Sequence, residues 1–172
     1  MTHTHAQPAE EWTVTGPILV GVVPGQNPAV VDTAARLAKA TGSALVCGYS
    51  DVTLYPVDGT TGGPAAPIDP DDGVDTDVPG DLSSALTGHL AGSGIKWSTV
   101  LLAGEPAHAL ARQAEAMGAS MIVVGTRDHT LASAIKEMTA GSVARHLFRC
   151  QPRPVLVVPI NPKVSSGHHD HL

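Results

Sequence analysis

Alternation between short apolar runs and segments of helical period is the feature that most restricts the fold of this chain of 172 residues. Each run is rich in β-branched residues and short, whereas the segments between runs place apolar residues every three or four positions. Strands that alternate with helices in this way form a parallel sheet that is covered on both faces, through right-handed crossovers. The five predicted strands are 18–23, 44–49, 97–102, 121–124 and 155–158.

Capping and stop signals bound the four predicted helices. Asn27 is a candidate cap for the first helix, and Gly42 ends it. Asp81 is a candidate cap for the second helix. Glu105 precedes a proline at the start of the third helix, where a carboxylate complements the helix dipole, so we read it as structural and not as a catalytic acid or base. The predicted helices are 28–41, 82–90, 106–117 and 143–148.

Residues 51–81 show no hydrophobic period and are filled with Pro, Gly and Asp. The sequence therefore predicts a long connecting loop, and we expect residues 56–79 to be flexible. The carboxylates between 69 and 77 do not have the spacing of an EF-hand loop, so no calcium site is expected there.

One domain over residues 16–160, with tails at 1–15 and 161–172, accounts for the whole pattern. Five of the nine histidines lie in those tails, outside the predicted fold, and we therefore expect no metal site built on them. They are His3, His5, His168, His169 and His171.

Composition and charge exclude several classes of partner. Hydrophobic residues make up 42% of the chain but aromatic residues only 3%, which predicts a core of Val, Leu, Ile and Ala. The net charge of −6 does not supply the basic surface that nucleic acids or anionic membranes need. No apolar run approaches the roughly 18 residues of a membrane span, and the first residues do not read as a signal peptide, so we expect a cytoplasmic protein.

Several motifs, in order, give the chain a resemblance to a known family. They are the strand 18–22, the step Gly104-Glu105-Pro106, the stretch 122–127, the step 141–144 and the final stretch 154–159. Over about residues 16–160 the chain resembles the universal stress protein family. The resemblance implies a Rossmann-like three-layer α/β/α sandwich with a five-stranded parallel sheet, of the adenine nucleotide alpha hydrolase-like type. It also implies a stress-response binding or regulatory module, not an enzyme, that pairs as a homodimer through 155–158 and whose surface changes are read by an unidentified protein partner.

Nucleotide-binding members of the family carry the motif Gly-x2-Gly-x9-Gly-Ser/Thr after the fourth strand, and this chain matches it in part. Gly125 and Gly141 fit the outer positions, but Asp128 replaces the middle glycine, and twelve residues (129–140) follow it instead of nine. The aspartate that ends the first strand in those members is Val23 here, whose side chain accepts no hydrogen bond. Both departures predict that ATP or AMP binds weakly.

The resemblance places the nucleotide at the ends of the first, second and fourth strands and at the start of the last helix. The residues expected there are Val22, Val23, Pro24, Tyr49, Gly125, Thr126, Arg127, Asp128, Gly141, Ser142 and Val143. Two alternatives stay open. One is a slow nucleotide hydrolase in which Arg127 or His129 stabilises phosphate charge, although no Gly-x-Ser-x-Gly elbow surrounds Ser142. The other is a structural dimer without a ligand.

Overall fold

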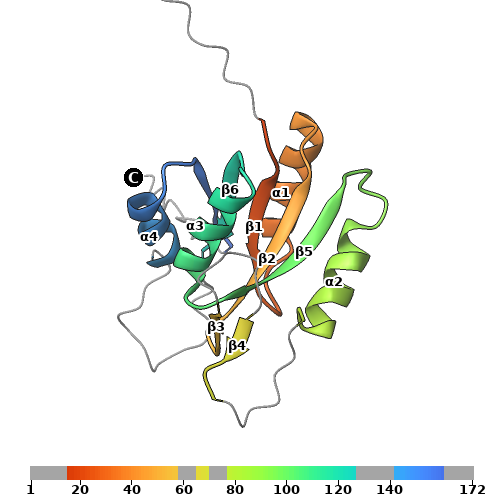
Figure 1. Cartoon of the computed structure of the whole chain (residues 1–172). Coiled ribbons are helices and arrows are strands. Elements are labelled where there is room, and N and C mark those ends of the chain that lie inside the picture. The colour runs from red at the N-terminus through yellow and green to blue at the C-terminus, as the bar shows by residue number, and fades with distance from the viewer. Residues whose placement is uncertain (1–14, 58–64, 70–76, 127–141, 161–172) are drawn as a thin grey trace, which may run out of the picture.

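A computed structural model describes residues 15–57, 65–69, 77–126 and 142–160. The main sheet has five parallel strands in the order β5-β2-β1-β6-β7, and the helices cover both of its faces (Figure 1). This arrangement confirms the predicted three-layer α/β/α sandwich. Its strands are β1 (Ile18–Val22), β2 (Leu45–Asp51), β5 (Trp97–Ala103), β6 (Met121–Gly125) and β7 (Val155–Val158). Its helices are α1 (Ala29–Thr41), α2 (Gly80–Leu90), α3 (Pro106–Ala116) and α4 (Ser142–Cys150).

Two aliphatic cores fill the spaces between the layers. The core under α1 and α2 contains Val30, Leu86 and Val123, whereas the core under α3 and α4 contains Leu110 and Leu147. The two cores therefore lie between one sheet and two sets of helices that cover its opposite faces. Among the described residues, no helix is both long and apolar enough to cross a bilayer.

A pair of glycines lets α3 approach the middle of the sheet. Gly21 of β1 and Gly48 of β2 face each other in the strand register. A Cβ atom built on either residue would lie 3.1 Å from a leucine methyl group, that of Leu110 for Gly21 and that of Leu102 for Gly48. Side chains at these two positions would push α3 outward, so the glycines set the spacing of this layer.

The predicted helix boundaries hold for α1 and α3, although Pro28 and not Asn27 is the N-cap residue of α1. Asn27 Oδ1 accepts a hydrogen bond from the backbone N–H of Ala29 at 2.9 Å, and Gly42 ends α1 in the left-handed conformation, with φ of 68°. Glu105 caps α3, because its two carboxylate oxygens accept from the N–H groups of Ala107 and His108 at 3.1 and 3.0 Å. The sequence predicted Asp81 as the cap of α2, and this prediction is wrong. That helix begins at Gly80, which places Asp81 inside its first turn.

The predicted loop over 51–81 is wrong in part, because it contains a second, smaller sheet. β3 (Leu54–Pro56) and β4 (Ala65–Pro67) form an antiparallel pair, and the backbone N–H of Ile68 donates to Thr53 O at 2.8 Å. The buried Leu54 side chain anchors this pair to the rest of the molecule. Strands of three residues are too short to show a period of two, so the sequence alone did not reveal them. Part of the stretch expected to be flexible therefore pairs as strand, while 58–64 and 70–76 lie outside the described residues.

Candidate functional site

The winding of the sheet reverses at β1. This strand lies between β2, which the chain reaches through α1, and β6, which the chain reaches only after passing through β5 and α3. Helices on either side of this point cover opposite faces of the sheet, so the carboxyl ends of β1 and β6 border a crevice. The loop that leaves β1, residues 23–28, lies at the edge of that crevice.

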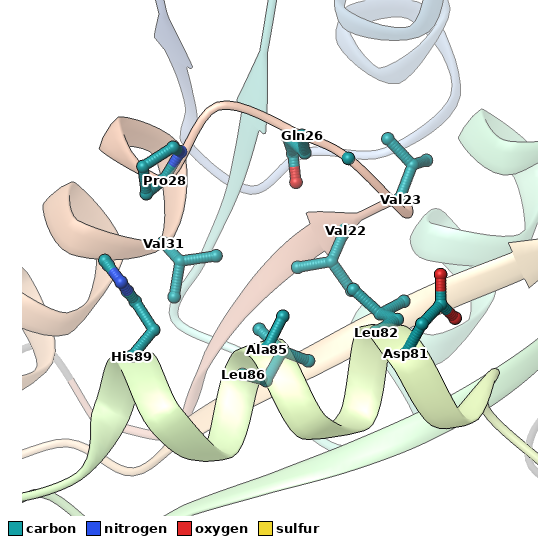
Figure 2. A pocket seen from close by; sticks show the side chains of 11 residues that line it. Val22, Val23, Gln26, Pro28, Val31, Asp81, Leu82, Ala85, Leu86 and His89 are labelled. Atoms are coloured by element: carbon teal, nitrogen blue, oxygen red, sulfur yellow. The ribbon is translucent and has the colours of Figure 1, made fainter.

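A pocket of about 270 Å³ opens beside this loop, between the end of β1, the start of α1 and the length of α2 (Figure 2). Its apolar walls include Val22, Val31 and Leu86. Its polar groups come from Gln26, Asp81 and His89, and none of the described residues that line it is Lys or Arg. A largely apolar cavity with a few fixed polar groups is the usual form of a small-molecule site.

Gln26 supplies a buried hydrogen-bond acceptor with no partner among the described residues. Its side-chain Nε2 donates to Gly21 O at 3.4 Å, which orients the amide. Its Oε1 is buried and accepts no hydrogen bond from the part of the chain that the structure describes. Figure 2 shows this oxygen directed toward α2. A buried acceptor left without a partner is costly, so a ligand that donates an N–H or O–H here would gain a favourable contact.

Acidic groups border both ends of the pocket. At one end of α2, His89 Nε2 lies 2.5 Å from Asp32 Oδ1 of α1 and ties the two helices together. At the other end stands Asp81 (Figure 2). Burial raises the pKa of Tyr49, and the negative charges of Asp51 and Asp81 raise that pKa further. The pocket therefore favours a neutral or cationic group over an anion.

The sequence-predicted site residues fall into three groups. Val22 and Val23 line the pocket, with the Val23 side chain 51% exposed. Pro24, Tyr49, Gly125, Thr126 and Val143 are described but are not among the residues that line it. Arg127, Asp128 and Gly141 lie outside the described residues, as does His129 of the hydrolase alternative, and of Ser142 only the backbone position at the start of α4 is known.

Three of the predicted residues that do not line the pocket have structural contacts of their own. Thr126 Oγ1 accepts a hydrogen bond from the backbone N–H of Ile160 at 2.9 Å, which joins the ends of β6 and β7. Val143 packs into the core under α3 and α4, on the other face of the sheet. Gly125 sits so close to α1 that a Cβ atom there would lie 2.7 Å from Val30 Cγ2. Their assignment to a nucleotide stays a prediction.

Sequence reasoning did not find Gln26, Asp81 and His89 as site residues. The chain offered one signal for Gln26, which follows directly on the Pro-Gly turn that ends the first strand. No comparable signal existed for the other two, because α2 is brought to β1 only by burial of its leucines.

Comparison with known proteins completes the description of this site. A sequence model of the Universal stress protein family matches residues 15–159. Universal stress protein YxiE of Bacillus subtilis is 40% identical over 68 residues, which is 40% of this chain and 44% of that protein. The match thus spans less than half of the length of that relative.

Solved structures extend the likeness to the fold. The universal stress protein of Archaeoglobus fulgidus superposes with a TM-score of 0.56 at 22% identity, over 84% of this chain and 99% of its own. A structure of the Archaeoglobus fulgidus protein in complex with dAMP gives a TM-score of 0.54 at 21% identity, over 84% and 98% of the two chains. At this level of identity the likeness shows a common fold.

Proposed function

This chain belongs to the universal stress protein family, and from that premise we propose that it is a regulatory module that binds an adenine nucleotide weakly and catalyses no reaction. We place the base of the nucleotide in the pocket beside the β1–α1 loop. A cytoplasmic location and an unidentified protein partner that reads the bound state belong to the same proposal.

The Gln26 side-chain oxygen, which has no hydrogen-bond partner in the described part of the chain, is the observation that carries this proposal. Adenine presents an exocyclic amino group, which donates N–H bonds, on a flat ring that apolar walls accommodate. Gln26 Oε1 is a buried acceptor on the pocket wall, and Val22 and Leu86 supply apolar surface. The Archaeoglobus fulgidus protein was solved in complex with dAMP, which supports an adenine nucleotide as the ligand.

The size and charge of the pocket support weak binding. Its volume of about 270 Å³ lies below the roughly 300–1,000 Å³ that encloses a drug-sized ligand, so it holds a base and leaves the phosphates outside. Asp81 and the net charge of −6 repel those phosphates. We therefore expect AMP to bind at least as well as ATP through this part of the site.

Calorimetry with adenosine, AMP and ATP tests the proposal. Gln26→Leu removes the acceptor, and a net hydrogen bond of about 0.5–1.5 kcal/mol corresponds to affinity that falls roughly 2- to 12-fold for all three ligands. Gln113→Leu is the matched control, because Gln113 Oε1 is also buried without a described partner but lies on α3, away from the pocket. Absence of binding to the wild type, or equal affinities in both variants, would contradict the proposal and favour a structural dimer without a ligand.

We further propose that the module is a homodimer paired through β7. This strand is at the edge of the main sheet, and its Leu156 side chain is 37% exposed. An unpaired apolar edge is an aggregation hazard unless another surface covers it. A second copy of the chain, paired edge to edge, would cover the backbone N–H and C=O groups at the edge of β7 and the Leu156 side chain.

A further inference from the structure

Three side chains that commonly bind metal ions meet on the face of the molecule opposite to the pocket. They are Glu105, at the cap of α3, His108, in the first turn of α3, and His146, in the middle of α4. One ligand atom from each lies within 4.8 Å of the other two, and all three side chains are exposed. None of them is among the described residues that line the pocket.

Packing of α3 on α4 creates this cluster. Leu110 and Leu147 are buried in the same core, and His108 and His146 stand close to them in sequence on the outer sides of the two helices. The two imidazole rings touch edge to face, with centroids 4.5 Å apart and planes at 68°. Their positions are therefore fixed by a packed core, although their own rotamers are free to adjust.

Glu105 is held in place by the helix that it caps. Each of its carboxylate oxygens accepts one backbone N–H, from Ala107 and His108. A carboxylate oxygen has two lone pairs, so one remains on each atom for a cation. Capping thus orients the carboxylate and leaves one lone pair on each oxygen available to a metal ion.

We propose that Glu105, His108 and His146 bind a divalent transition-metal ion of the Zn²⁺ type. Imidazole nitrogen and carboxylate oxygen are ligands that zinc accepts, and three protein ligands leave a fourth position for water. Zinc–ligand bonds of about 2.0–2.1 Å place tetrahedral ligand atoms roughly 3.3 Å apart. Each atom must therefore move by about 1 Å, which exposed side chains can do by rotation.

Such an ion would clamp α4 onto α3. The two helices come from parts of the chain separated by β6, and a bond from each to one ion would add a cross-link on the outer surface of their shared core. Two features oppose the cation and set a modest affinity: the positive end of the α3 dipole and Arg149, one turn after His146 on α4. The tail histidines considered from sequence play no part in this site.

Zinc titration of the full chain tests the site once the competing tail ligands are removed. The starting protein carries His3, His5, His168, His169 and His171 replaced by glutamine. We expect calorimetry to show one Zn²⁺ bound per chain and the thermal midpoint to rise with Zn²⁺. In that background His108→Gln and His146→Gln should each weaken binding at least about tenfold and abolish the Zn²⁺-dependent shift.

Two further variants separate metal binding from helix stability. His89→Gln, on the opposite face and paired with Asp32, should leave Zn²⁺ affinity unchanged. Glu105→Gln loses the charge and one of the two hydrogen bonds that the carboxylate accepts at the cap, so it should lower the metal-free thermal midpoint and also weaken Zn²⁺ binding, and the two effects are measured separately by unfolding without metal and by titration. The proposal is overturned if the protein without tail histidines binds no Zn²⁺, or if His108→Gln and His146→Gln bind it as the starting protein does.

Discussion

Substitution of Gly125 by alanine should destabilise the protein through a steric conflict at the end of β6. A Cβ atom at this position would lie 2.7 Å from Val30 Cγ2, 2.8 Å from Ile160 Cδ1 and 3.3 Å from Gln26 Nε2. The isoleucine and glutamine atoms end flexible side chains and can move away. Val30 cannot easily do so, because it is fully buried and β-branched residues in helices have one preferred χ1 rotamer. Overpacking of this kind costs about 1–3 kcal/mol.

Two companion variants make the reasoning specific. Gly88→Ala, on the exposed side of α2 with no atom near its Cβ position, should stabilise the protein by about 0.5–1 kcal/mol. Val30→Ala alone should cost at least about 1.6 kcal/mol, at about 0.8 kcal/mol for each methylene equivalent lost. Combined with Gly125→Ala, it makes room for the new methyl group. The double variant should therefore be more stable than the sum of the two single effects predicts.

Urea unfolding at fixed pH, with thermal unfolding as a second probe, measures all four variants. For a domain of this size a change of about 1 kcal/mol moves Tm by about 2–4 °C, so the decrease for Gly125→Ala is readily detected. An unchanged midpoint for Gly125→Ala would refute the close packing of α1 on the end of β6. Strict additivity in the double variant would show that Val30 is not the group that the new methyl meets.

Three other predictions concern the nucleotide, the thiols and the dimer. Asp128→Gly should tighten ATP binding more than adenosine binding, because only the phosphates feel the lost charge, whereas Val23→Asp should tighten the binding of both ligands. Calorimetry measures these affinities. Tight ATP binding by the wild type, or an Asp128→Gly effect that is equal for ATP and adenosine, would contradict this prediction. Burial raises the pKa of Cys47 from 9.0 to about 12, so a thiol reagent at pH 8 should modify only the exposed Cys150 in the folded protein. The unfolded Cys47 thiol loses its proton above about pH 9 while the folded one keeps it, so stability should fall as pH rises from there, with a shallower slope in Cys47→Ala. Leu156→Lys should convert a dimer to a monomer in light scattering, and a monomeric wild type would refute pairing through β7.

The candidate site shows how far motif reasoning extends. Val22 and Val23 were expected near a ligand because they end the first strand, and they do line the pocket. The same motifs gave no hint of Gln26, whose orientation depends on a hydrogen bond to Gly21 O across the turn. They assigned Glu105 a structural role at the start of α3, where its carboxylate does cap the helix, but they gave no hint of the two histidines beside it.

Local signals in the sequence determined the order and type of the main elements. The apolar period, the hydrogen bond from Ala29 N–H to Asn27 Oδ1 at the start of α1 and the Gly42 stop act within a few residues, so they can be read directly from the chain. Tertiary structure alone decided the pairing of β3 with β4, the pocket between β1 and α2, and the meeting of His108 with His146. β3 and β4 lie close in sequence but are too short to show a period of two. The pocket and the histidine pair bring together residues far apart in sequence, and their distances follow from how the helices pack on the sheet, which no local pattern encodes.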